Sequence, residues 1–177
     1  MRAAGGFLLG VVVTLVVIAG GVWGYLKFGS LPVATSDKPF PLEAQIVRVP
    51  LRARILHEMQ QPSIAANEQV YQAGAQIYAQ ECAACHGAPG HDSDFAQWMY
   101  PPAPQLWKKH GKGNVVGVSD DDPGETYWKV KNGIRLTGMP SFQHVLSDEQ
   151  MWDVTLLLKA ADQKMSPQVW STLSGKP

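Results

Sequence analysis

The chain has 177 residues, of which 45% are hydrophobic, and its 15 Lys and Arg residues balance 15 Asp and Glu residues. This length accommodates one compact domain with attachments and is too short for two large domains. With no excess of positive charge, the composition argues against a nucleic-acid-binding protein. From residue 67 onward the chain holds 9 basic and 12 acidic residues, so the expected globular part is mildly acidic and the preceding part is mildly basic.

An uncharged stretch of 24 residues runs between Arg2 and Lys27. A helix of this length, at about 1.5 Å per residue, spans the roughly 30 Å hydrocarbon core of a membrane, and Trp23 and Tyr25 stand where interfacial aromatic residues belong. We therefore expect an uncleaved transmembrane anchor over residues 1–29. A cleaved signal peptide is the alternative, but the apolar run exceeds the usual core of about 7–15 residues and no small-x-small cleavage site follows it.

The next segment, residues 30–66, is expected to be a spacer. Its prolines disfavour helix and favour extended chain, with a short strand or helical turn within residues 47–59. These prolines are Pro32, Pro39, Pro41, Pro50 and Pro62. The arginines Arg48, Arg52 and Arg54 are interpreted as a solvated basic face, with contact to lipid headgroups or to a partner subunit as the alternative.

Residues 67–165 are expected to form the compact domain, which should be mainly α-helical. Asn67 is a good N-cap for a helix that runs into a pair of cysteines, and apolar residues recur along it at three- and four-residue spacing. A second helix is predicted over residues 123–131, after a run of aspartates.

A third helix of this domain is expected to open with a capping box formed by Ser147 and Gln150 and to end before Pro167. Loops rich in glycine and proline are expected between the helices. Residues 166–177 are interpreted as a C-terminal tail.

The only two cysteines, Cys82 and Cys85, are followed at once by His86. This is the attachment pattern of a c-type haem, in which two thiols bind the porphyrin covalently and the adjacent histidine lies under the iron. A thioredoxin-like dithiol would require a βαβ setting, which the sequence does not predict. A zinc site would require two further ligands, for which His91 and His110 are the candidates, but the motif fits haem better. We therefore expect one covalent haem c. Haem c is normally attached outside the cytoplasmic membrane, so we expect a single-pass protein of a bacterial cytoplasmic (inner) membrane with its haem domain on the periplasmic side.

The stretch from Asn67 to Gln163 resembles a class I cytochrome c domain. The resemblance rests on Gly74 and Tyr78 ahead of the cysteines, on Trp152 in the last helix, and on the segments Pro104-Gln105-Leu106 and Gly138-Met139-Pro140. It implies that the carbonyl of Pro104 orients His86 and that Met139 is the second axial ligand of the iron. It also implies that Trp152 packs where the last helix crosses the first one at Gly74.

Other residues compete for the second axial position. Met99 lies only 13 residues after His86, whereas Met139 lies 53 residues after it, beyond a helix that can carry the chain around the haem. His110, His144 or an open position are the remaining alternatives. Arg135 is a candidate partner for a haem propionate, the alternative being an ordinary surface charge.

Four aromatic residues are expected either to shield the haem from water or to pack generically in the core. These are Trp98, Tyr100, Trp107 and Trp128.

Together these features predict electron transfer rather than an enzymatic activity of the chain itself. We expect a membrane-tethered carrier, or the cytochrome c subunit of a respiratory or photosynthetic membrane complex, with the membrane and redox proteins as partners and no nucleic acid. The alternative is a haem enzyme, peroxidase-like or sulfur-oxidising, with an open or displaceable sixth ligand. The single haem motif and the good candidate for a sixth ligand argue against that alternative.

Overall fold

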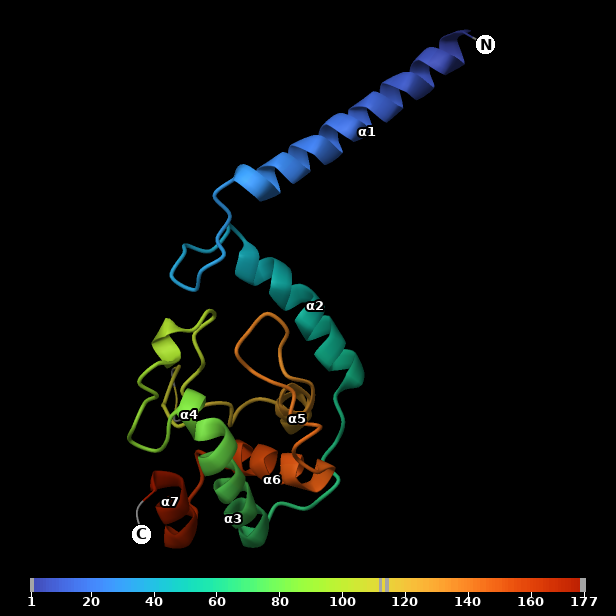
Figure 1. The fold of residues 1–177 in the computed structure, drawn as a ribbon. Coiled ribbons are helices and arrows are strands. Elements are labelled where there is room, and N and C mark those ends of the chain that lie inside the picture. Colours follow the sequence, from blue (N-terminus) through green and yellow to red (C-terminus); the bar gives the residue numbers. More distant parts are fainter. Residues whose placement is uncertain (1, 112, 114, 176–177) are drawn as a thin grey trace. The chain divides into compact units, whose positions relative to one another are not determined.

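The computed structural model describes residues 2–111, 113 and 115–175. Residue 1 of the expected anchor, residues 112 and 114 of the expected loop and residues 176–177 of the expected tail lie outside the described residues. The chain divides into two compact units, Met1–Phe40 and Pro41–Pro177. Within the described residues there are helices and isolated bridges but no strand, so the expected mainly α fold is confirmed (Figure 1).

The first unit contains one long helix, α1 (Arg2–Phe28). Its segment Gly5–Phe28 has a mean hydropathy of 2.4 and buries none of its most apolar window. Lys27 lies over the ring of Trp23, with 4.9 Å between its Nζ and the ring centroid. This helix is long and apolar enough to anchor the chain in a membrane, although a signal sequence has the same properties.

The second unit begins with a helix where an extended spacer was expected. Helix α2 (Glu43–Glu58) has 16 residues and contains Pro50, which removes one backbone hydrogen bond. The helix is held by the rest of the unit: Ile55 is only 3% exposed, and Trp128 Nε1 donates a hydrogen bond of 2.9 Å to Glu58 Oε2. The expectation of extended chain is therefore wrong for residues 43–46, and the short strand or helical turn expected within residues 47–59 is part of a longer helix, because tertiary packing overrides the cost of the proline.

Helix α3 (Glu68–Ile77) starts as expected at Asn67, whose side chain accepts hydrogen bonds from the backbone N–H groups of Gln69 and Val70. The chain continues without a break into a π-helical turn (Tyr78–Cys82) and a short helix, α4 (Ala83–His86). This continuous rod carries the Cys-x-x-Cys-His motif at its end.

The other two predicted helices are also present. Helix α5 (Pro123–Asn132) is capped by the Asp122 carboxylate, which accepts from the N–H of Gly124 at 2.7 Å. It ends at Gly133, where φ is 67° and a Cβ would lie 2.6 Å from the Pro140 carbonyl carbon, so only glycine fits. Helix α6 (Asp148–Lys159) opens with the predicted capping box.

The core lies where α3 crosses α6, at Gly74 as expected. A Cβ on Gly74 would clash with the backbone oxygen of Asp153 and touch Leu157 Cβ at 3.0 Å, so the missing side chain lets the two helices approach closely. Trp152 is 2% exposed, but its ring stacks on Tyr127 of α5, with 4.0 Å between centroids and 9° between planes. Asp153 and Leu157 lie nearest to Gly74, and the packing of Trp152 against α3 near Gly74 stays a prediction.

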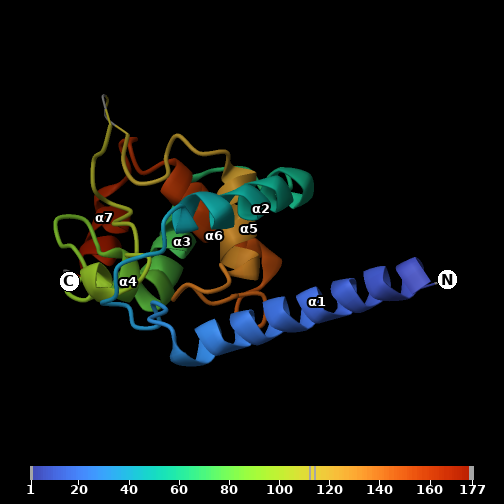
Figure 2. The ribbon, with the colours of Figure 1, turned by 90° about the horizontal axis from the view of Figure 1, so that it is seen from above.

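The segment expected to be a tail contains a further helix, α7 (Pro167–Ser174), which lies beside α3 (Figures 1 and 2). Ser166 caps it, and Val169 and Leu173 are buried. Gln72 Nε2 of α3 donates a hydrogen bond of 2.9 Å to Thr172 Oγ1. The apolar pair four residues apart buries itself against α3, which makes this segment part of the domain.

Candidate haem site

The two cysteines are presented by the rod formed by α3, the π-helical turn and α4. The wide turn ends at Cys82, where the N–H of Ala83 donates to the carbonyl of Tyr78, and Cys85 and His86 follow in α4. Both thiols are half-buried and free, so no disulfide joins them. The motif therefore offers two thiols and an imidazole along one short helical segment, as attachment to a porphyrin edge requires.

The environment of Cys82 argues against dithiol redox chemistry. Burial, followed by the negative charges of Glu81 and Cys85, raises the pKa of the Cys82 thiol to about 12. A reactive dithiol needs a lowered thiol pKa. Among the described residues there is also no group of three His, Cys, Asp or Glu side chains that could hold a metal ion, which argues against a zinc site.

His86 is held by the segment that the resemblance pointed to. Its Nδ1 lies 2.8 Å from the carbonyl oxygen of Pro104, a distance at which Nδ1–H donates a hydrogen bond. Burial lowers the pKa of His86, and the Pro104 carbonyl opposes this shift. The imidazole is therefore neutral near pH 7, with its proton on Nδ1 and the lone pair of Nε2 available to a metal.

Gln105 links the attachment motif to the following loop, a role that the sequence did not reveal. Its Nε2 donates to the carbonyl of Cys85 at 3.2 Å and to that of Ala103 at 3.1 Å, while its Oε1 accepts from the N–H of Ser93 at 2.7 Å. The Ser93 hydroxyl in turn donates to the carbonyl of Ala84 at 2.7 Å. These bonds fix the motif relative to Pro104, and the only sequence signal was the position of Gln105 inside Pro-x-Leu.

Tyr78 forms hydrogen bonds to the backbone at the end of the same motif. Its hydroxyl donates to the carbonyl of Gly87 at 2.8 Å and lies 3.2 Å from that of His86. The ring meets Trp107 edge to face, with 5.6 Å between centroids. The carbonyl of His86 also accepts from the N–H of Leu106 at 3.0 Å, so the backbone around the histidine is held by several bonds.

Met139 lies in the loop between α5 and α6 and is partly buried against the core. Its N–H donates to Thr137 Oγ1 at 3.1 Å, and its carbonyl accepts from the N–H of Ile134 at 3.2 Å. A Cβ on Gly138 would collide with the terminal methyl of Met99. The structure thus brings Met99 beside the Met139 loop, a proximity that their separation in sequence did not predict.

The remaining candidates are placed less favourably or have no contact that bears on the haem. His110 Nε2 is hydrogen-bonded to the carbonyl of Gly117 within its own loop, and His144 is exposed. Arg135 is exposed and forms no ion pair with any residue that the structure describes, so its charge is available to an anionic group.

The four aromatic residues differ in their surroundings. Trp128 is buried and Trp107 packs against the core, whereas Trp98 is 73% exposed in the chain itself. Tyr100 is half-buried and lies outside the core cluster. Generic core packing is therefore observed for Trp128 and Trp107 and not for Trp98 or Tyr100.

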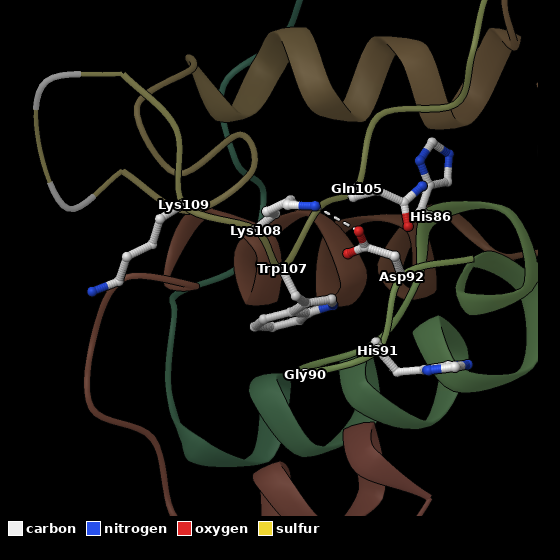
Figure 3. A pocket seen from close by; sticks show the side chains of 9 residues that line it. His86, Gly90, His91, Asp92, Gln105, Trp107, Lys108 and Lys109 are labelled. Carbon is white, nitrogen blue, oxygen red and sulfur yellow. Dashed lines mark hydrogen bonds and ion pairs between the residues drawn. The ribbon is translucent and has the colours of Figure 1, made fainter. Parts of the chain in front are cut away.

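A cavity of about 490 Å³ adjoins the motif on the side of Gln105 and Trp107 (Figure 3). Lys108 Nζ and Asp92 Oδ2 are joined by an ion pair of 2.6 Å at its wall, and the ring of His86 stands at its edge, turned away from Trp107. Neither cysteine nor Met139 lines this cavity. His86 is the only member of the proposed ligand set that lines it.

The donor set fits haem c: two free thiols at the right spacing, a neutral histidine oriented through Nδ1 and a partly buried thioether. A helical domain built around such a motif defines a c-type cytochrome. The family described as "Cytochrome C oxidase, cbb3-type, subunit III" matches residues 69–157, which run from α3 to near the end of α6. The chain belongs to this family, and its cofactor is haem c, used for electron transfer. No curated protein and no solved structure matches the chain.

Proposed function

We propose that this chain carries one haem, bound covalently by Cys82 and Cys85 and ligated by His86 and Met139. We further propose that it passes electrons while anchored to a membrane. The observation that supports the ligand assignment best is the bond between His86 Nδ1 and the Pro104 carbonyl, because it leaves Nε2 free and directed by a fixed ring.

When bound, haem supplies one-electron chemistry at its iron. The residues of the chain determine how that chemistry is used. His86 is held in one tautomer and Met139 is held in a hydrogen-bonded loop, so the two ligands are preorganised. Ligation by a thioether and an imidazole would give the iron a higher reduction potential than ligation by two imidazoles, and two protein ligands would leave no position for a substrate. This arrangement suits an electron carrier and disfavours the peroxidase-like or sulfur-oxidising alternative.

The membrane role rests on α1 and on the family. The length and hydropathy of Gly5–Phe28 support an uncleaved anchor, and attachment of haem c outside the cytoplasmic membrane supports a periplasmic haem domain. The family name is that of an oxidase subunit, which favours the cytochrome c subunit of a respiratory membrane complex over a free tethered carrier. Redox proteins of that complex are the proposed partners.

The haem content can be measured directly. The holoprotein from a host competent in cytochrome maturation should have the mass of the polypeptide plus one haem, and the haem should stay with the chain in denaturing electrophoresis. A double variant, Cys82→Ala with Cys85→Ala, should lose the haem under the same conditions because no other cysteine exists. A wild-type mass equal to that of the bare polypeptide would exclude covalent attachment.

Anchoring makes a separate prediction. The full chain should require detergent for release from membranes and should keep residues 1–28 in its intact mass. A chain that starts at Ser36 behind a cleavable signal retains all of α2 and should appear in the soluble fraction with an unchanged haem spectrum. Release of the full chain by salt alone would show that α1 does not anchor it, and an intact mass lacking residues 1–28 would show that α1 is cleaved off.

A further inference from the structure

Helix α2 has two different faces. One face packs on the domain through Ile55 and Glu58. The other carries apolar residues at spacings of three, four and three, which lie within an arc of about 80° on a helix. These residues are Ile46 (66% exposed), Val49 (70%), Ala53 and Leu56 (57%). Packing on the domain therefore accounts for Ile55 but leaves this second apolar stripe open.

Positive charge borders the stripe. Arg52 is exposed about 40° beyond the Leu56 edge of the stripe, and Arg48 is exposed further around the helix, about 20° from Ile55. Neither arginine forms an ion pair with any residue in the described part of the chain. Arg54, on the other side, is paired with Glu58 of the same helix at 2.9 Å. An apolar stripe bordered by the unpaired guanidinium of Arg52, with that of Arg48 further around the helix, matches the chemistry of an anionic lipid surface, in which apolar side chains enter the acyl boundary and cations meet phosphates.

If α1 spans a bilayer, the short linker between α1 and α2 keeps α2 near that bilayer. Residues 29–42, which number 14, separate the end of α1 from the start of α2. At 3.3–3.6 Å per residue this linker reaches at most about 50 Å, so α2 stays at a high effective concentration near the lipid. Because this linker ties α2 to the bilayer that α1 would span, the bilayer is the occupant that the observations favour.

We propose that α2 is an interfacial helix that lies on the outer leaflet of the anchoring membrane. The stripe of Ile46, Val49, Ala53 and Leu56 enters the headgroup boundary, and Arg48 and Arg52 contact lipid phosphates. Four apolar side chains give only weak binding alone, and the linker makes that binding effective. The inference rests on the proposed anchoring by α1.

A spin label at Val49→Cys tests the proposal in full-length holoprotein reconstituted into vesicles of phosphatidylcholine and phosphatidylglycerol. The haem consumes the two native thiols, so only the new cysteine is labelled. The matched control is Gln163→Cys, at an exposed site after α6. The Val49 label should collide readily with dissolved oxygen and poorly with a water-soluble nickel chelate, whereas the Gln163 label should show the opposite behaviour.

Two results would overturn the proposal. Equal access of the nickel chelate to both labels would mean that α2 stands in water, and protection of the Val49 label from both reagents would mean that a second copy or a partner subunit covers the stripe. Flotation of the labelled protein with the vesicles is scored independently. Failure to float would contradict the anchoring by α1. Flotation with a water-exposed label at position 49 would contradict only the interfacial position of α2.

The role of the arginines is tested in the Val49→Cys background. Arg48→Gln with Arg52→Gln should shift the docking equilibrium about 30-fold towards water, since each cation near an anionic surface contributes about 1 kcal/mol. Lys164→Gln, an exposed charge after α6, should leave it unchanged. The haem spectrum should be the same in all variants. If the double arginine variant leaves the access of oxygen and of the nickel chelate to the label unchanged, Arg48 and Arg52 do not contact lipid phosphates.

Discussion

Replacing Trp152 by alanine is expected to lower the free energy of unfolding by about 3–5 kcal/mol, as large truncations in a packed core do. The indole is only 2% exposed and lies flat on Tyr127, with 4.0 Å between the ring centroids. Stacked aromatic pairs contribute about 0.5–1.5 kcal/mol beyond their buried area. The variant therefore loses both the packing volume and the contact that ties α6 to α5. Denaturant unfolding of the holoprotein, followed by circular dichroism, measures the change.

Trp98→Ala is the matched control, because it makes the same chemical change at a side chain that is 73% exposed. Its effect should lie within about 0.5 kcal/mol, the range usual for surface substitutions. Equal effects of the two variants would contradict the placement of Trp152 in the core. A large effect of Trp98→Ala alone would mean that the exposed indole becomes buried in the holoprotein.

The helix starts were predictable from sequence because each depends on residues only a few positions apart. Asn67 caps α3 through N–H groups two and three residues ahead, and Ser147 and Gln150 form their capping box across three residues. Such local signals do not depend on knowing the rest of the fold. The motif of Cys82, Cys85 and His86 was readable for the same reason.

The helices that the sequence did not predict, α2 and α7, depend on contacts between segments that are far apart in the chain. Pro50 argued against a helix, but α2 forms because Ile55 is buried and Glu58 binds Trp128, 70 residues away. The sequence alone predicts a tail over residues 166–177, but Val169 and Leu173 are buried in α7, whose packing partner α3 lies far back in the chain. In both cases packing energy outweighs the local pattern.

At the candidate site, too, local features were predictable from sequence and contacts between distant segments were not. The bond between His86 and Pro104 joins segments 18 residues apart and was expected only because the Pro-x-Leu segment resembles that of class I cytochromes. The bonds of Gln105 and the packing of Met99 against Gly138 join irregular loops, which have no periodicity from which a contact can be inferred. The proximity of Met99 to Met139 makes the choice of axial ligand a question for experiment.

Met139→Ala is expected to abolish the methionine–iron charge-transfer band at the red edge of the spectrum and to lower the reduction potential. The thioether favours ferrous iron, so its loss removes that preference and opens the position to water or an added ligand. Unchanged ligands in both oxidation states keep rearrangement small during electron transfer, and the variant should therefore also transfer electrons more slowly. Met139→His should restore two protein ligands at a potential below that of the wild type.

Met99→Ala is the matched control, since the Met99 thioether packs against Gly138 beside the same loop. It should keep the charge-transfer band, because the hydrogen bonds of Met139 to Thr137 and Ile134 hold the loop without Met99. Loss of the band in Met99→Ala together with its retention in Met139→Ala would make Met99 the axial ligand. Loss of the band in both variants, with two protein ligands restored by Met139→His, would instead show that Met99 supports the loop and that Met139 binds the iron. Covalent attachment through Cys82 and Cys85 is independent of either result, because the thiols lie on the α4 side of the site.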